Sequence, residues 1–278
     1  MTVADANRAQ ADLWTASGPI WTALRDRFDA QSDAHGVAAI DALAPAEGEH
    51  VIDVGCGAGS TTVELAARVG PTGRVTGLDI SPTMIEGARA HAAERGHDNI
   101  EFVVADAMVD SIGRNADGIF SRFGVMFFAD ATAAFTNMRA ALRPGGRLGF
   151  VCWKDPGSNL WASMPLGIAS KYVDIPFGGA PDAPGPFSFG DPDRVRTILT
   201  DAGFSDVDLS GRDQRVKVGT DPEDAANFLL GLNPMTRSLE GDPKAHLKAE
   251  VEEAFSAWHT DDGVLVPSAT WIVTATNP

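Results

Sequence analysis

Residues 51–62 read VIDVGCGAGSTT, and this stretch decides the fold. The apolar run over 51–54 predicts a short buried strand. Three glycines at alternating positions follow that strand: Gly55, Gly57 and Gly59. A run compatible with a helix begins directly after them at Ser60. Glycines at a strand-to-helix turn allow positive φ and let a ligand approach the backbone closely. The stretch therefore predicts a ligand-binding turn of a nucleotide-binding α/β fold, with a tight strand-to-helix turn that binds nothing as the alternative.

The carboxylate of Asp53, at the end of this strand, narrows the choice of ligand. Beside the phosphates of a dinucleotide a carboxylate is disfavoured by like charge, whereas it suits a ligand that is cationic there. S-adenosylmethionine carries a sulfonium and an ammonium group and has no phosphate. The pattern Asp53-x-Gly55-x-Gly57-x-Gly59 resembles the first motif of class I S-adenosylmethionine-dependent methyltransferases. In the same turn, we expect Cys56 to be a small residue beside the ligand rather than a nucleophile, and Ser60 to lie beside the cofactor as well.

A second acid stands at the end of the next predicted strand, Val75–Leu78. Asp79 follows that strand, where a carboxylate accepts hydrogen bonds from both ribose hydroxyls of an adenosine. Ser81 and Pro82 then predict a helix start, with serine as the N-cap. The resemblance implies that Ile80 packs on the adenine and that Met84 covers the same ring. Ordinary core packing is the alternative for Ile80 and Met84.

Three further strand ends follow in order. The strand from Ile100 ends in Asp106 and Ala107, and the resemblance implies that they bind the adenine amino group and a ring nitrogen. The strand over 117–120 leads to Ser121 and Arg122, which we also expect beside the cofactor, and the strand over 147–153 follows. In open α/β sheets, ligands bind outside the carboxyl ends of the strands. Five ordered strand ends, three of them acidic, form a more specific pattern than any single motif.

The alternation of strands and helices predicts an α/β fold with a doubly wound, Rossmann-like sheet. We expect helices at Ser60–Val69, Pro82–Arg95 and Ala131–Leu142, and a sixth strand at Phe204–Leu209. The resemblance implies seven strands, with the last, Trp271–Thr274, inserted antiparallel between strands five and six. We therefore expect one methyltransferase domain over residues 1–278, with its cofactor-binding core at 46–153.

Segments outside the core carry no substrate motif. Residues 1–45 predict three helices, 4–13, 19–28 and 37–43, with a break at Gly18-Pro19. The resemblance favours a helical lid in which Trp14 and Trp21 close over cofactor and substrate, with core packing as the alternative.

Insertions are expected after strand five (154–190) and after strand six (221–262, helical at 222–230 and 244–259). The first is rich in Pro and Gly, and we expect it to form part of a substrate pocket wall. Its interleaved aromatic residues are Phe177, Phe187 and Phe189.

Methyl transfer needs mainly orientation and a dry site, and it needs a general base only if the nucleophile must lose a proton. Arg122 is a candidate either for holding a substrate carboxylate or for bracing the lid through a salt bridge. Phe123, beside it, is expected to add apolar surface to the substrate site. The other catalytic candidates are His35, Tyr172 and His259, and for each of them surface or packing roles are the alternative.

Composition excludes several classes of protein. The net charge is −16, and the 22 Lys and Arg residues are scattered, so the sequence predicts no nucleic-acid partner. No apolar run reaches the length of a membrane span, and the polar start lacks the layout of a signal peptide, so we expect a cytoplasmic protein. The two cysteines and six histidines show neither a disulfide framework nor metal-ligand spacing. We expect a small-molecule acceptor; the sequence predicts neither its identity nor an oligomeric state.

Two other functions compete with methyl transfer. An NAD(P)-dependent oxidoreductase would use the same fold, but Asp53, the serine at position 60 and the lack of a Tyr-x-x-x-Lys pair count against it. A non-catalytic S-adenosylmethionine-binding module is the other alternative. Intact acids at Asp53, Asp79 and Asp106 predict a working cofactor site in either case.

Overall fold

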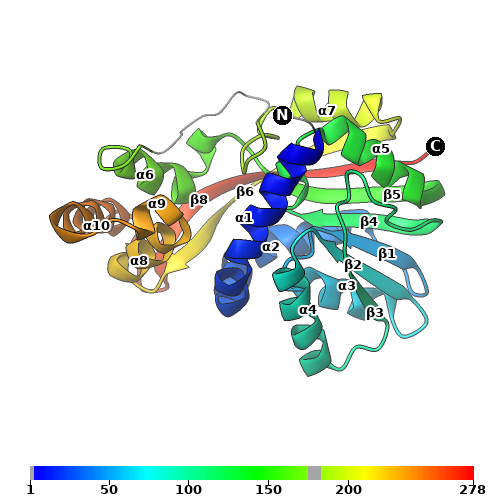
Figure 1. Cartoon of the computed structure of the whole chain (residues 1–278), viewed down its shortest axis with the longest axis horizontal. Helices are drawn as coiled ribbons and strands as arrows, with labels where there is room; N and C mark the ends of the chain where they lie inside the picture. Colours follow the sequence, from blue (N-terminus) through cyan, green and yellow to red (C-terminus); the bar gives the residue numbers. More distant parts are fainter. Residues whose placement is uncertain (1–2, 175–182) are drawn as a thin grey trace. The chain divides into compact units, whose positions relative to one another are not determined.

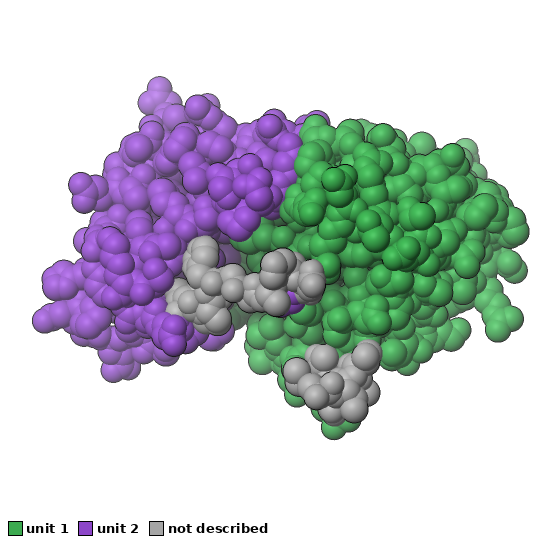
Figure 2. Space-filling view, turned by 90° about the horizontal axis from the view of Figure 1, so that it is seen from above, with its two compact units in different colours: residues 1–153, 184–211, 270–278 green, residues 154–183, 212–269 purple. Residues whose placement is uncertain are grey.

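The computed structural model describes residues 3–174 and 183–278, with the side chains of residues 3–6 left out. The chain divides into two compact units (Figure 2). The first comprises Met1–Trp153, Pro184–Gly211 and Thr270–Pro278, and the second comprises Lys154–Ala183 and Arg212–Ala269. The second unit therefore consists largely of the two predicted insertions. The assignment of the whole chain to one domain stays a prediction.

A mixed sheet forms the centre of the first unit (Figure 1). Its order is β3-β2-β1-β4-β5-β8-β6, and the two-residue strand β7 pairs with β8. The strands are β1 (His50–Val54), β2 (Arg74–Asp79), β3 (Ile100–Val104), β4 (Ala116–Arg122), β5 (Leu142–Trp153), β6 (Ser205–Gly219), β7 (His259–Thr260) and β8 (Gly263–Thr276). Strands β1 to β5 pair in parallel, and β8 pairs antiparallel with β5. The predicted doubly wound sheet and its antiparallel last strand are confirmed, although β6 and β8 are longer than the sequence predicted.

Helices cover both faces of this sheet. They are α1 (Val3–Ala23), α2 (Arg25–Leu43), α3 (Ser60–Val69), α4 (Pro82–Arg95), α5 (Ala131–Ala141) and α7 (Pro192–Asp201), with the 3-10 turn η1 (Val125–Phe127). Adjacent residues of a strand point to opposite faces. Val151 joins the core cluster that contains residues of α2 and α3, whereas the ring of Phe150 lies 5.5 Å from that of Phe135 on α5. Helices α2 and α3 therefore pack on one face and α5 on the other.

The predicted helix break at Gly18-Pro19 is wrong, because α1 runs through both residues and ends at Ala23. Proline lacks an N–H, which leaves the carbonyl of Thr15, four residues earlier, without its helical donor. The hydroxyl of Thr83 on α4 donates to that carbonyl at 2.9 Å. Gly18 permits the approach, since a Cβ there would lie 2.0 Å from Thr83 Oγ1. The two residues mark where α1 docks on α4 rather than where it ends.

The first insertion also differs from its prediction. Residues 175–182, including Phe177, lie outside the described part of the chain. Phe189 is fully buried in the first unit, where its ring lies 6.1 Å from Phe135 and 6.2 Å from Phe150. It therefore completes the hydrophobic core beneath α5 and does not line a substrate pocket. Tertiary packing of this kind leaves no local sequence pattern.

The second unit is mainly helical. Its helices are α6 (Leu160–Ala169), α8 (Pro222–Leu232), α9 (Pro234–Arg237) and α10 (Gly241–Ser256), with the 3-10 turn η2 (Pro156–Ser158). Helix α10 packs on α8 and α6. The predicted helices of the second insertion are confirmed as α8 and α10, although the predicted end of the latter at His259 belongs to β7.

Candidate cofactor site

The three glycines of the turn between β1 and α3 have two different roles. All three have positive φ, +70° at Gly55, +54° at Gly57 and +88° at Gly59. A Cβ at Gly55 would lie 2.9 Å from the backbone of Gly124, and one at Gly59 would lie 3.0 Å from Ala88 Cβ. A Cβ at Gly57 would meet no atom within 4 Å. The outer glycines thus allow close packing, while Gly57 leaves open space over the turn.

Asp53 is fully buried beneath this turn. Its Oδ2 accepts hydrogen bonds from Thr61 at 2.8 Å and Thr62 at 2.7 Å, so that it fixes the first turn of α3. Its Oδ1 is buried without a hydrogen-bond partner. Burial raises the pKa of this carboxyl, and the two threonine hydroxyls and Arg122 partly offset the rise. The predicted contact of Asp53 with a cationic ligand stays a prediction, and Oδ1 is the atom with the capacity to make it.

Asp79 ends β2 directly beside the glycine turn. The backbone N–H of Gly57 donates to its Oδ2 and that of Ser81 to its Oδ1, each at 2.9 Å. Burial raises the pKa of this carboxyl to about 6, despite the two amide hydrogen bonds. A carboxylate oxygen accepts more than one hydrogen bond, so both oxygens retain acceptor capacity for ribose hydroxyls. Ile80 is half-buried and Met84 buried, and their predicted contact with adenine stays a prediction.

Asp106 lies beyond the end of β3, and both of its carboxylate oxygens already accept hydrogen bonds. Its Oδ1 accepts from the N–H of Met108 at 2.9 Å, and its Oδ2 accepts from the side-chain amide of Asn7 on α1. Ala107 is buried, and its carbonyl oxygen accepts from Asn137 at 2.9 Å. Sequence reasoning did not single out Asn7, because 99 residues separate it from Asp106.

The end of β4 is tied to α2. Arg122 donates to Asp29 and to Asp33, each at 2.7 Å, and the Ser60 hydroxyl donates to the second oxygen of Asp29 at 2.6 Å. Burial raises the pKa of Asp33. Of the two roles considered for Arg122, the structure shows a salt bridge, and it joins the end of β4 to α2. The Ser121 hydroxyl donates to the Val54 carbonyl at 2.7 Å, which joins β4 to β1, and its cofactor contact stays a prediction.

We expect Arg122→Gln to lower the free energy of unfolding by about 2 kcal/mol, because it leaves the largely buried Asp29 without its cation. Asp33→Asn is the matched control. The Asp33 side chain is 59% exposed, so its loss should cost about 0.5 kcal/mol. Urea unfolding of the two variants measures the difference. Equal losses would mean that Asp29 does not depend on Arg122.

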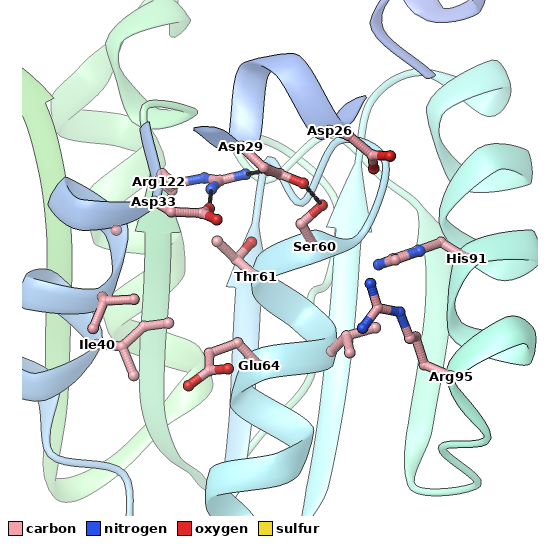
Figure 3. A pocket seen from close by; sticks show the side chains of 13 residues that line it. Asp26, Asp29, Asp33, Ile40, Ser60, Thr61, Glu64, His91, Arg95 and Arg122 are labelled. Carbon is pink, nitrogen blue, oxygen red and sulfur yellow. Dashed lines mark hydrogen bonds and ion pairs between the residues drawn. The ribbon is translucent and has the colours of Figure 1, made fainter. Parts of the chain in front are cut away.

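A cavity of about 190 Å³ lies between α2, α3 and α4 (Figure 3). Arg122 lies between Asp29 and Asp33 on one side of it, and His91 and Arg95 reach from α4 on the other. Its lining includes Ser60, Thr61 and Arg122 but none of Gly57, Asp79 or Asp106. The cavity therefore reaches the end of β4 through Arg122, but it does not include the glycine turn or the acids after β2 and β3. The open space over Gly57 and the acceptor atoms of Asp79 meet at the ends of β1 and β2.

Aromatic side chains gather at the ends of β4 and β5. Phe123, at φ +60°, stacks on Trp153 with ring centres 4.0 Å apart. A bulky residue at positive φ is strained, and such strain concentrates at functional sites. His35 is fully buried, with its ring 5.5 Å from that of Trp153 and its Nδ1 3.0 Å from the Thr270 hydroxyl. His35 thus lies in the interior rather than facing solvent.

Trp14 and Trp21 join α1 to its neighbours. Their rings lie 5.7 Å apart; Trp14 lies 4.9 Å from Phe127 of η1, and Trp21 stacks on Phe28 of α2 at 3.8 Å. Both tryptophans are half-buried. The arrangement fits either of the predicted roles, packing or a closed lid, and the lid stays a prediction.

The roles of the remaining candidates stay predictions. Tyr172 and His259 belong to the second unit, where the Tyr172 hydroxyl donates to Glu250 and His259 is exposed on β7. Cys56 is buried, and burial raises the pKa of its thiol well above the usual value, which keeps it a neutral, small residue. Among residues 3–174 and 183–278, no group of three or more His, Cys, Asp or Glu side chains is placed to hold a metal ion.

Comparison with known proteins bears on what this site binds. Residues 51–146 match a family described as a methyltransferase domain. Aklanonic acid methyltransferase DauC of Streptomyces sp. (strain C5) is 40% identical over 112 residues, which cover 40% of this chain and 51% of that protein. The predicted resemblance to class I S-adenosylmethionine-dependent methyltransferases is thereby confirmed for residues 51–146. Its described helices include none that combines the length and the apolar character needed to cross a membrane.

Two further similarities agree with this resemblance. Nocamycin O-methyltransferase of Saccharothrix syringae is 32% identical over 177 residues, which cover 60% of this chain and 63% of that protein. The chain thus spans between half and two thirds of the length of these two curated relatives. A phosphoethanolamine N-methyltransferase 2 of Haemonchus contortus, solved with S-adenosylhomocysteine, has a TM-score of 0.55 at 17% identity. That match covers 88% of this chain and 53% of the other, and it shows the fold.

Proposed function

We propose that this protein is an enzyme that transfers a methyl group from S-adenosylmethionine to a small organic acceptor. The observation that carries the proposal is the joint geometry of Gly57 and Asp79. The Gly57 amide is hydrogen-bonded to the Asp79 carboxylate, and open space lies over Gly57. An adenosine ribose placed there finds a carboxylate for its hydroxyls and a turn without side-chain obstruction. The match of residues 51–146 to a methyltransferase domain supports this cofactor over a nicotinamide dinucleotide.

The residues present fit the charge of S-adenosylmethionine. The buried Oδ1 of Asp53 is an acceptor without a hydrogen-bond partner, and a buried unsatisfied acceptor is costly. A cationic or N–H-bearing group satisfies it, whereas a phosphate would not.

When bound, S-adenosylmethionine supplies an already activated methyl group, so the protein's residues mainly bind, orient and exclude water. The Asp79 carboxylate holds the adenosine end, and the α1 helix with Trp14 covers the site. Arg122 keeps α2 in place through Asp29 and Asp33. We assign no general base: His35 is fully buried, the Tyr172 hydroxyl donates to Glu250, and His259 is exposed. The rate enhancement is then attributed to orientation.

The acceptor is proposed to be a small molecule with apolar ring surface. Phe123 and Trp153 provide a stacked aromatic pair at the ends of β4 and β5, and flat rings stack on such surfaces. The relatives' names, aklanonic acid methyltransferase and nocamycin O-methyltransferase, support a small organic acceptor. We also propose a cytoplasmic location, which the two free, buried cysteines support.

Calorimetric titration with S-adenosylmethionine, S-adenosylhomocysteine and NADH tests the cofactor. Micromolar binding of the two sulfur ligands and none of NADH is the expected result, and binding of NADH alone would refute the proposal. Transfer of labelled methyl groups to a panel of phenols and hydroquinones then tests the activity. Tight cofactor binding without transfer to any acceptor would favour the non-catalytic binding module.

A further inference from the structure

We propose that Asn7 occupies the adenine subsite in the free protein and must leave it before the cofactor binds. This inference rests on the proposed function, in which Asp106 receives the adenine amino group. The Asn7 side-chain amide already donates to Asp106 Oδ2. A primary carboxamide and the amino group of adenine are both neutral N–H donors. Asn7 therefore satisfies Asp106 with the kind of hydrogen bond that adenine would make.

The burial around this contact shows why both groups do not fit at once. Asn7 Nδ2 also lies 3.7 Å from the sulfur of Met108. Asn7 is 7% exposed, Ala107 5% and Met108 4%. All three residues are thus almost completely buried, and Asn7 lies directly against Met108. A ring that reaches the Asp106 carboxylate and the Ala107 amide must therefore displace the Asn7 side chain.

The attachment of α1 allows its N-terminal end to move separately. The middle of the helix is fixed to α4, where Thr83 donates to the Thr15 carbonyl and Gly87 leaves room for Thr22. The N-terminal end is held through Asn7. One turn later, Gln10 Oε1 is buried without a hydrogen-bond partner, so the inner face of this end is incompletely satisfied. Releasing Asn7 frees the end of α1 while the docked part around Thr15 and Thr22 stays in place.

The apparent affinity for the cofactor depends on the fraction of molecules in which Asn7 has left the subsite. The apparent dissociation constant is the intrinsic one divided by the fraction of molecules competent to bind. If Asn7 is released in about one molecule in ten, removing it tightens binding about tenfold. A residue that merely supports the fold, or that touches the cofactor directly, would weaken binding when it is removed.

The test compares S-adenosylhomocysteine binding to the wild-type chain, Asn7→Ala and the control Arg8→Ala, which changes the exposed neighbouring residue of α1. We expect Asn7→Ala to bind about tenfold more tightly with a faster association rate, and Arg8→Ala to stay within about twofold. Unchanged or weaker binding to Asn7→Ala would overturn the inference.

Amide hydrogen exchange without ligand provides the second measurement. In Asn7→Ala, residues 3–14 should exchange faster than in Arg8→Ala, with residues 15–23 unchanged. Equal exchange in both variants would mean that Asn7 does not hold the end of α1, and would overturn the inference. Failure of the proposed function looks different, because S-adenosylhomocysteine would then bind to none of the three proteins.

Discussion

Gly57→Leu is expected to weaken S-adenosylmethionine binding at least about 100-fold while leaving the chain folded. The φ of +54° costs a non-glycine residue about 1–2 kcal/mol, which a domain of this size tolerates. No atom lies within 4 Å of the Cβ position, so the leucine meets no protein atom there as its side chain begins. It extends instead into the open space over the turn, where we place the cofactor. Calorimetric titration measures the loss.

Gly96→Leu is the matched control for this substitution. Gly96 has φ +70° and likewise nothing within 4 Å of its Cβ position, but it caps the C-terminus of α4. Both variants therefore carry similar backbone strain and should show similar losses of melting temperature. Only Gly57→Leu should lose cofactor binding. Retained affinity in Gly57→Leu would show that the ligand does not pass over the glycine turn.

The helices next to the cofactor site could be predicted from the sequence because their start signals are local. Helix α3 begins at Ser60 after Gly59, and α4 begins at Pro82 after the Ser81 N-cap, as predicted. The strand ends at Asp53, Asp79 and Asp106 could also be placed, since short apolar runs lead to each. The position of the last strand between β5 and β6 required the family resemblance, because strand order has no local signal.

The contacts that close the site could not be predicted, because they join residues far apart in the chain. Ninety-three residues separate Arg122 from Asp29, and 99 separate Asn7 from Asp106. Local rules also misplaced the break in α1. These rules count Pro19 as a helix breaker. They do not include the Thr83 hydroxyl, which donates to the Thr15 carbonyl that Pro19 leaves without a helical donor. Long-range polar partners therefore fix where α1 and α2 attach and which hydrogen bonds Asp29 and Asp106 accept.

Asp79→Asn is expected to weaken cofactor binding about 100-fold, which corresponds to about 3 kcal/mol. The carboxylate accepts from the N–H groups of Gly57 and Ser81, and both of its oxygens have capacity left for a ribose hydroxyl. In asparagine one of these oxygens becomes an NH₂ group, which faces a backbone donor and accepts nothing. The charge that strengthens the remaining hydrogen bonds is lost as well. The same titration against wild type measures the effect, and wild-type affinity would refute the placement of the ribose.

The pKa of about 6 at Asp79 adds a pH dependence to this prediction. The folded-state pKa lies above the ordinary value of 3.8, so the folded chain holds a proton between these two values that the unfolded chain does not. By linkage, Asp79 makes the free protein more stable as pH falls from about 6 towards 4.

Ribose hydroxyls need the ionised form of Asp79, so cofactor affinity should fall over the same pH range. Near pH 5 only about one molecule in ten is ionised, and wild-type affinity should fall about tenfold relative to pH 7. Asp79→Asn should lack this part of the decline, because asparagine does not titrate. Burial also raises the pKa of Asp53 and of Asp33, and any decline in affinity that these two groups cause should be the same in both proteins. Identical pH profiles in wild type and variant would mean that Asp79 does not bind the ligand in its ionised form.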